Sequence, residues 1–379
     1  TQSATQSATT SLTMDPITES PLRSCKICPR RCGVDRLSGG IGYCGAGSGI
    51  RVARAALHHW EEPCISGERG SGTVFFSFCN MKCIYCQNYE ISHNGAGLEI
   101  GTERLAEIFL ELEGAGAHNI NLVTPTHYAP QIRQALILAK EKGLKLPILY
   151  NCSGYEGEGL KLLEGLVDIY LPDVKYWTKE EGEELSDAPD YFEEAMAAVD
   201  EMIRQVGSPV FDPKGIMQKG VMVRHLLLPG GLDSAKRITE HLFRKYGNQI
   251  FYSFMSQYTP DAPGVSRETI EGYLRQGKER SERGESGPRK ASKSDLQSLD
   301  KDDLREDNLR EDDLREDDLR RIAGVLRLDQ RVSESDYEEW IDFALELGIE
   351  NGFTQEGGSA SESFIPAFDG EGVRKDIDK

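Results

Sequence analysis

The chain has 379 residues, 38% of them apolar, which is enough for one large domain with appendages or for two modest ones. Its formal net charge of −19 excludes a general phosphate-neutralising surface, so we expect no nucleic-acid partner. No run approaches the ~18 consecutive apolar residues of a membrane-spanning helix, so we expect no membrane partner either.

Residues 1–20 are rich in Ser and Thr and contain neither the basic nor the apolar region of a secretory signal. We therefore expect a disordered leader and a cytoplasmic protein. The chain contains nine cysteines. Without an export signal, so many thiols favour metal or redox chemistry over disulfides.

Residues 21–66 form a Cys-rich and Gly-rich segment that holds Cys25, Cys28, Cys32 and Cys44. Four thiols this close together can close a tetrahedral metal site, with either zinc or an iron–sulfur cluster as occupant. Their spacing does not decide between the two, and free or redox-active thiols are the remaining alternative. Cys64 is a candidate fifth member of the set.

Strand-like and helix-like segments then alternate along the chain. The predicted strands are 73–77, 119–123, 147–151, 168–171, 221–228 and 250–255, and the predicted amphipathic helices are 103–113, 130–142, 191–206 and 234–246. This alternation predicts βαβ units and a parallel sheet. In barrels of this kind the chemistry lies at the C-terminal ends of the strands.

Three cysteines, Cys79, Cys83 and Cys86, follow the first predicted strand at CxxxCxxC spacing. Three thiols on one loop can hold three irons of a [4Fe-4S] cluster, whereas ordinary electron-transfer clusters take four cysteines. The missing ligand leaves one iron open for a substrate or cofactor. A structural zinc loop would need a fourth ligand, and three closely spaced cysteines pair poorly as disulfides.

Further polar candidates lie at later strand ends. Asp173 and Lys175 close the strand predicted at 168–171, and Arg224 and His225 lie within the strand predicted at 221–228. Such groups can meet a bound cofactor. The alternatives are a local ion pair for Asp173 and Lys175, and a hydrogen-bonded core histidine for His225.

The C-terminal third is less regular. Residues 264–330 read as a low-complexity acidic insertion, in which a five-residue repeat places a leucine at positions 304, 309, 314 and 319. Residues 333–347 predict a helix that is capped by Ser333, and residues 351–366 read as a loop. The expected domains are 1–20, 21–66, 67–263, 264–330 and 331–379.

The CxxxCxxC spacing, with the aromatic Tyr85 before the last cysteine, resembles the radical S-adenosylmethionine (SAM) enzymes. The resemblance implies a partial (β/α)6 TIM-type barrel and a [4Fe-4S] cluster on Cys79, Cys83 and Cys86, whose open iron binds SAM. In that family an electron from the cluster splits SAM into methionine and a 5′-deoxyadenosyl radical, which removes hydrogen atoms. The electron donor is then a flavodoxin or ferredoxin.

The stretches 28–33, 55–67, 122–128, 224–230, 255–260 and 351–353 resemble one branch of this family, the uncharacterised relatives of pyruvate formate-lyase activating enzyme. The resemblance implies an oxidoreductase that takes hydrogen from a glycyl-radical protein, from another protein or from a small molecule. A non-catalytic iron–sulfur electron-transfer protein and a zinc-binding interaction protein are the alternatives.

The same resemblance implies roles for single residues. Tyr85 packs on the adenine of SAM, Asp173 and Lys175 contact its ribose and carboxylate, and His225 also contacts SAM. Well-studied activating enzymes hold the SAM amino group with a Gly-Gly-Glu motif, where this chain has Thr124-Pro125-Thr126-His127. The hydroxyl of Thr124 or Thr126, or backbone carbonyls, would then take its place.

Overall fold

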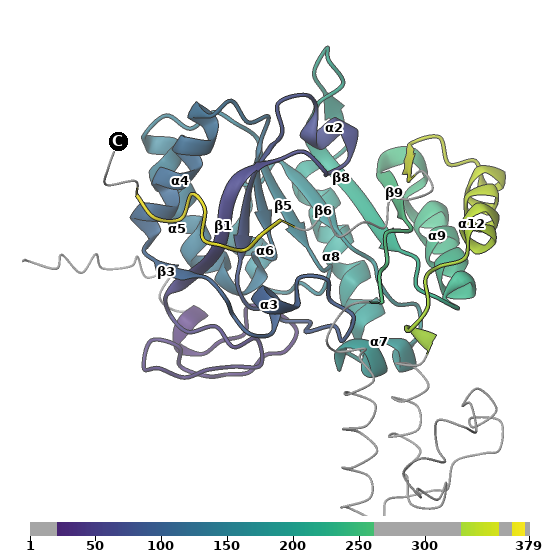
Figure 1. The fold of residues 1–379 in the computed structure, drawn as a ribbon, viewed down its shortest axis with the longest axis horizontal. Helices are drawn as coiled ribbons and strands as arrows, with labels where there is room; N and C mark the ends of the chain where they lie inside the picture. Colours follow the sequence, from purple (N-terminus) through teal and green to yellow (C-terminus); the bar gives the residue numbers. More distant parts are fainter. Residues whose placement is uncertain (1–20, 261–326, 356–365, 376–379) are drawn as a thin grey trace, which may run out of the picture.

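The computed structural model describes residues 21–260, 327–355 and 366–375 (Figure 1). The expected leader and nearly all of the acidic insertion lie outside these ranges, so both remain predictions. The described strands form one sheet in the order β10-β9-β8-β6-β5-β4-β2-β1-β3, and β7 pairs with β8.

Six parallel strands form the body of the sheet: β2 (Ser71–Phe76), β4 (Ile120–Val123), β5 (Ile148–Cys152), β6 (Ile169–Pro172), β8 (Met217–Leu226) and β9 (Phe251–Met255). Every residue of β2, β4, β5 and β6 is buried, as expected for parallel strands covered on both faces. The order and direction of these strands confirm the α/β partial barrel expected from the sequence.

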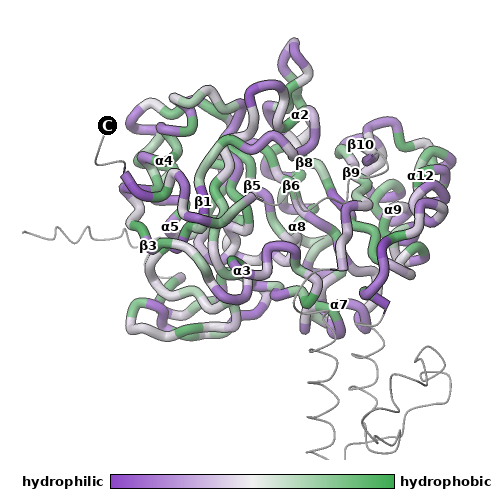
Figure 2. Tube along the Cα trace, viewed as in Figure 1, coloured by the Kyte–Doolittle hydropathy of each residue, from purple (hydrophilic) through white to green (hydrophobic). Residues whose placement is uncertain are grey.

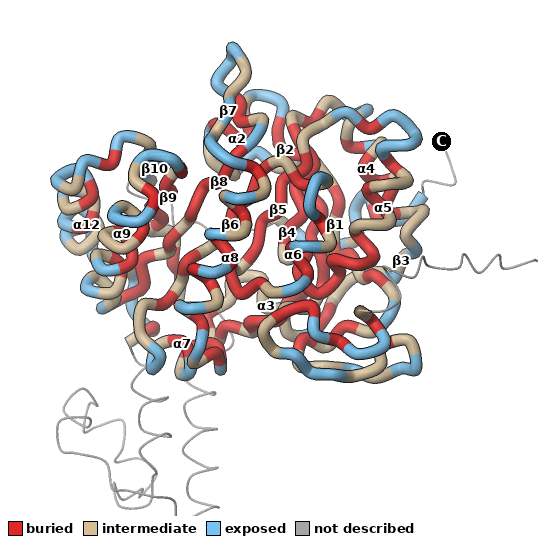
Figure 3. Tube along the Cα trace, turned by 180° about the vertical axis from the view of Figure 1, so that it is seen from behind, coloured by how far each residue is buried: buried red, intermediate tan, exposed pale blue. Residues whose placement is uncertain are grey.

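Helices connect the strands and cover the outside of the barrel (Figure 1). The longer ones are α4 (Thr102–Gly114), α5 (Ala129–Glu141), α8 (Tyr191–Val206) and α9 (Leu232–Tyr246), close to the predicted ranges. The shorter ones are α2 (Pro63–Ser66), α3 (Tyr89–Ser92), α6 (Gly159–Leu162), α7 (Lys179–Ser186), η1 (Thr126–Tyr128) and η2 (Gly247–Gln249). Apolar residues concentrate in the strands and on the helix faces turned toward them (Figures 2 and 3).

Four strands outside the six-stranded parallel body were not predicted. β1 (Ile50–His58) pairs antiparallel with β2 and with β3 (Leu98–Ile100), β7 (Val210–Phe211) pairs with β8, and β10 (Gly352–Thr354) pairs parallel with β9. The loop predicted over 351–366 is therefore wrong at its start. Three residues beginning with glycine carry no strand signal of their own, and only pairing with the distant β9 makes them a strand.

The C-terminal helix α12 (Glu334–Leu347) begins as predicted, because the Ser333 hydroxyl accepts a hydrogen bond from the Asp336 amide at 3.1 Å. Its Trp340 is fully buried and donates from Nε1 to the Thr239 hydroxyl on α9 at 2.9 Å. The helix therefore belongs to the layer outside β8 and β9. Across the part of the chain that the structure describes, every helix is too short or too polar to cross a membrane.

Candidate active site

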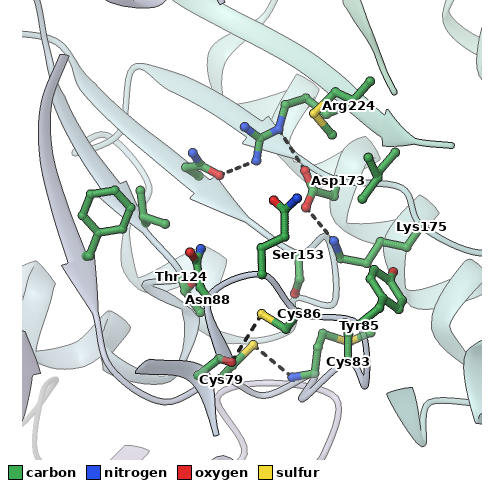
Figure 4. A pocket seen from close by; sticks show the side chains of 18 of the residues that line it. Cys79, Cys83, Tyr85, Cys86, Asn88, Thr124, Ser153, Asp173, Lys175 and Arg224 are labelled. Atoms are coloured by element: carbon green, nitrogen blue, oxygen red, sulfur yellow. Dashed lines mark hydrogen bonds and ion pairs between the residues drawn. The ribbon is translucent and has the colours of Figure 1, made fainter. Parts of the chain in front are cut away.

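A cavity of about 250 Å³ opens at the C-terminal ends of the parallel strands (Figure 4). The loop after β2 brings three cysteines and Tyr85 to it, and the ends of the neighbouring strands bring polar side chains. Its lining includes Glu61, Cys79, Cys83, Tyr85, Cys86, Thr124, Asn151, Ser153, Asp173, Lys175 and Arg224. Most of the candidates that the sequence singled out are therefore brought together.

The cysteine loop is held in a tight conformation. Phe78 and Lys82 adopt φ values of 73° and 50°, in the left-handed region that non-glycine residues seldom occupy. The Cys79 sulfur accepts a hydrogen bond from the Met81 amide, and the Cys86 sulfur accepts one from the Ser92 hydroxyl, both at 3.3 Å. Such contacts direct the thiols into the cavity and favour their thiolate forms.

Burial and the neighbouring thiols disfavour the ionisation of Cys79 and Cys86. Burial, and then the neighbouring thiols Cys83 and Cys86, raise the pKa of Cys79 to about 12. Burial and Cys83 likewise raise the pKa of Cys86. Three thiolates can coexist here only beside a positive centre, since a bound metal reverses this penalty.

The number of thiols fits an iron–sulfur cluster better than a single structural ion. A structural zinc ion takes four protein ligands, and this loop brings three thiols to the cavity. A cluster places each thiolate on a separate iron and can leave one iron open. Cys79, Cys83 and Cys86 would hold such a group.

Two cations flank Asp173 at the end of β6. Its carboxylate lies 2.7 Å from Lys175 Nζ and 2.9 Å from Arg224 Nε. Burial alone would raise the pKa of Asp173, but the adjacent Arg224 and Lys175 outweigh it and lower that pKa below its usual value. The cavity therefore presents an ionised carboxylate held between two cations.

Tyr85 forms the wall between the cysteine loop and β6. Its side chain is 5% exposed, and its hydroxyl lies 2.9 Å from that of Tyr176. The Tyr258 ring meets it nearly edge-on, with 6.3 Å between the ring centroids. These contacts fix the ring orientation at the cavity, while its contact with adenine remains a proposal.

His225 is turned away from the cavity. Its Nδ1 donates to the Val174 carbonyl at 2.5 Å, and its ring meets Trp340 of α12 edge-on. Burial lowers its pKa to about 4, so the ring is neutral. Successive residues of a strand point to opposite faces, so Arg224 faces the cavity and His225 the outer layer. The structure thus places His225 among core side chains, and its contact with SAM stays a prediction.

Thr126 also lies behind the cavity rather than in its lining. Its hydroxyl donates to Glu156 Oε1 at 2.6 Å. Thr124, two residues earlier, does line the cavity, with a φ of 57° that is rare for a β-branched residue. Of the two threonines predicted to replace the Gly-Gly-Glu motif, Thr124 is part of the cavity lining and Thr126 is not.

Sequence reasoning missed Glu61, Asn151 and Ser153, which line the cavity, and it named Arg224 without giving it a role. Arg224 of β8 donates from Nη1 to Glu61 at 3.2 Å and from Nη2 to Asn151 of β5 at 2.6 Å. These bonds connect β8 with β5 and with the loop before α2. The Ser153 hydroxyl is buried and has no hydrogen-bond partner among the described residues. Strand alternation could have favoured Arg224 over its neighbour, but nothing local marks Glu61, Asn151 or Ser153.

The second cysteine set is also gathered at one place. Cys25, Cys28, Cys32 and Cys44 line a small cavity of about 10 Å³ together with His127. Every cysteine in the described ranges is a free thiol. A metal at this position remains a prediction.

Comparison with known proteins agrees with the fold and the cysteine loop. Residues 73–233 match the family model of the Radical SAM superfamily, and this range begins in β2 and includes the cysteine loop. The chain is also similar to the uncharacterized protein MJ0674 of Methanocaldococcus jannaschii, at 28% identity over 256 residues, 65% of this chain and 69% of that protein.

Among solved structures, SuiB of Streptococcus suis bound to its precursor peptide SuiA matches at 13% identity and a TM-score of 0.35, over 54% of this chain and 44% of SuiB. SuiB bound to S-adenosylmethionine matches at 13% identity and a TM-score of 0.35, over 52% and 45%. The chain thus spans less than half the length of SuiB. With scores this low, the fold assignment depends on the strand order of the sheet itself.

Proposed function

We propose that this protein is a radical SAM enzyme in which Cys79, Cys83 and Cys86 hold a [4Fe-4S] cluster and SAM binds beside it. One observation carries the proposal: three thiols of a single loop open into the same cavity as the ion-paired Asp173 and Lys175 (Figure 4). Bound together, the cluster and SAM supply reductive cleavage of SAM and abstraction of a hydrogen atom.

The protein's own contribution is to bind and orient SAM. The Asp173 carboxylate is immobilised by two cations and keeps lone pairs that can accept hydrogen bonds from ribose hydroxyls. Besides the N–H that Lys175 gives to Asp173, its ammonium group has two further N–H donors, which can bind the carboxylate of SAM. The buried Tyr85 ring offers a flat apolar face to adenine.

We assign the SAM amino group to the edge formed by Thr124 and Ser153. Thr124 follows β4 and Ser153 follows β5, and the Thr124 amide donates to the Asn151 carbonyl at 2.9 Å. A buried hydroxyl without a partner costs about 1–3 kcal/mol, so Ser153 favours a ligand that would satisfy it. An ammonium group can donate to both hydroxyl oxygens.

The hydrogen donor is a protein or a small molecule, and a glycyl-radical protein is the candidate that the activating-enzyme resemblance supports. The electron would come from a flavodoxin or ferredoxin. A non-catalytic iron–sulfur carrier is the competing function, but a carrier normally saturates its irons with four cysteines, and this loop supplies three.

The test is anaerobic SAM cleavage. The full chain is reconstituted with iron and sulfide, reduced with dithionite and supplied with SAM, and 5′-deoxyadenosine is measured by chromatography. We expect product from the unmodified chain and from Cys64→Ala, a buried cysteine outside the cavity, but not from Cys83→Ala. Iron binding with neither SAM cleavage nor SAM binding to the cluster by electron paramagnetic resonance would support the carrier function instead.

A further inference from the structure

The Cys-rich segment wraps three buried thiols around one small cavity. Cys25, Cys28 and Cys44 are each 8% exposed, whereas Cys32 lies at the exposed edge. Backbone turns direct the thiols inward: the Gly33 amide donates to the Cys25 carbonyl at 2.8 Å, and the Ala46 amide donates to the Cys44 sulfur at 3.4 Å. Amide donors to sulfur are a common feature of thiolate ligands.

His127 completes the wall of this cavity, and its tautomer follows from one hydrogen bond. Its Nε2 lies 2.8 Å from the Ser77 carbonyl oxygen, which can only accept, so Nε2 carries the hydrogen and Nδ1 carries a lone pair. That Nδ1 atom is buried and has no hydrogen-bond partner in the described parts of the chain. A buried acceptor without a partner, on a residue that lines the same cavity as the four thiols, indicates a missing ligand.

The surrounding scaffold fixes His127 against the cysteine segment. Arg36 is 1% exposed and donates from Nη1 to the His127 carbonyl at 2.6 Å and from Nε to the Gly47 carbonyl at 2.9 Å. Histidines that bind metals characteristically give their other ring N–H to a carboxylate or a backbone carbonyl, as His127 does to Ser77. The ring is therefore oriented before any metal binds.

We propose that this cavity binds a single thiophilic metal ion of the Zn²⁺ class through the thiolates of Cys25, Cys28 and Cys44 and through His127 Nδ1. Three thiolates and one imidazole form an established tetrahedral zinc set. A volume of about 10 Å³ accommodates one water-sized sphere, which suits one ion and not a four-iron cluster. Cys32 stays outside the tetrahedron.

Metal binding would change both the thiols and the segment. Each thiol releases its proton on binding, and because no three donors among the described residues yet converge on one point, the side chains would rotate inward. The bound ion would join the cysteine segment to the end of β4, three residues beyond Thr124 at the SAM cavity. Its role is structural, independent of SAM chemistry.

The experiment uses the full chain with Cys79, Cys83 and Cys86 replaced by Ala. This background removes the first cysteine set and keeps Cys25, Cys28, Cys32, Cys44 and His127 unchanged. Zinc per chain is counted after loading with Zn²⁺, and X-ray absorption at the zinc edge identifies the ligands. We expect one zinc, three sulfur ligands at ~2.3 Å and one nitrogen at ~2.0–2.1 Å. In this background, Cys32→Ser should keep the zinc, and Cys28→Ser should weaken its binding at least tenfold.

His127→Gln should also lose at least tenfold in zinc affinity, but this variant could fail to fold. X-ray absorption at the zinc edge is measured with His127 in place, so it shows whether a nitrogen ligand is present even where the variant does not fold. Four sulfur ligands without nitrogen, iron with acid-labile sulfide after reconstitution, or no bound metal would each overturn the proposal. Because this background lacks the first cysteine set, its result is separate from that of the SAM-cleavage test.

Discussion

Asp173 and Arg224 are joined twice. Their backbones form a parallel bridge where β6 and β8 end, and the Arg224 Nε atom lies 2.9 Å from the Asp173 carboxylate. The same guanidinium reaches Glu61 in the loop before α2. One pair of residues therefore contributes both to the pairing of two strands and to the charge of the cavity, so we expect its loss to affect both stability and cofactor binding.

Replacing Arg224 by methionine leaves Asp173 and Glu61 without a shared, largely buried cation. We expect a loss of about 3–5 kcal/mol in the free energy of unfolding, because the largely buried Glu61 carboxylate loses its ion-pair partner, whereas Asp173 keeps Lys175. Urea denaturation measures it. Arg244→Met is the matched control, since its ion pair with Glu240 is exposed on α9 and should contribute about 0–1 kcal/mol.

The two threonines after β4 should separate cofactor binding from stability. Thr124→Val keeps the β-branched shape but removes a hydroxyl from the cavity, and should weaken SAM binding about five- to tenfold, as for one lost hydrogen bond of about 1–1.5 kcal/mol. Thr126→Val removes the donor to Glu156 and should reduce stability without changing SAM affinity. Calorimetric titration of the reconstituted protein with SAM measures the affinity of each variant, and urea denaturation measures its stability. Equal losses of affinity in the two variants would contradict the assignment.

Glu156 should make stability depend on pH between about 4 and 7. Burial raises its pKa to about 7, although hydrogen bonds from Thr126 and Tyr150 oppose the rise. Because the folded pKa exceeds the unfolded one, this contribution is fully present below pH ~4.3 and is lost as pH rises through about 7, a change of about 3 kcal/mol.

Glu156→Gln should remove that part of the profile, as measured by urea denaturation at a series of pH values. Glu158→Gln is the control, since its side chain is 70% exposed and should leave the profile unchanged. If the free energy of unfolding depends on pH in the same way in the unmodified chain and in Glu156→Gln, the Glu156 carboxyl is not the cause of that dependence.

His225→Ala should act on stability alone. The change removes a hydrogen bond to the Val174 carbonyl and an edge contact with Trp340, so we expect a loss of about 2–3 kcal/mol. SAM affinity of the reconstituted protein should change by less than about threefold, which corresponds to about 0.7 kcal/mol, because His225 does not line the cavity. A loss of SAM affinity of tenfold or more would show that His225 contributes to cofactor binding.

Much of this architecture could be predicted locally. The hydrophobic runs that became β2, β4, β5, β6, β8 and β9, and the amphipathic periods of α4, α5, α8, α9 and α12, lie in contiguous segments. Cys79, Cys83 and Cys86 could be grouped for the same reason, because all three occupy one short loop. A short spacing along the chain limits how far apart side chains can lie.

The rest depended on contacts between distant segments. β10 exists because it pairs with β9, about 100 residues earlier, and Glu61 reaches Arg224 across 163 positions. Which of Arg224 and His225 faces the cavity depends on strand register, since a shift by one residue exchanges the two faces.

The sequence by itself determined the parallel α/β fold, the three-thiol loop and the closeness of four further cysteines, because contiguous residues carry those signals. Only the tertiary structure decided that Thr124 lines the cavity beside the cysteine loop, that Thr126 donates to Glu156, and that His127 lines the cavity of the second cysteine set. The physical reason is that the direction of a side chain is set by the segments packed around it, and these come from distant parts of the chain.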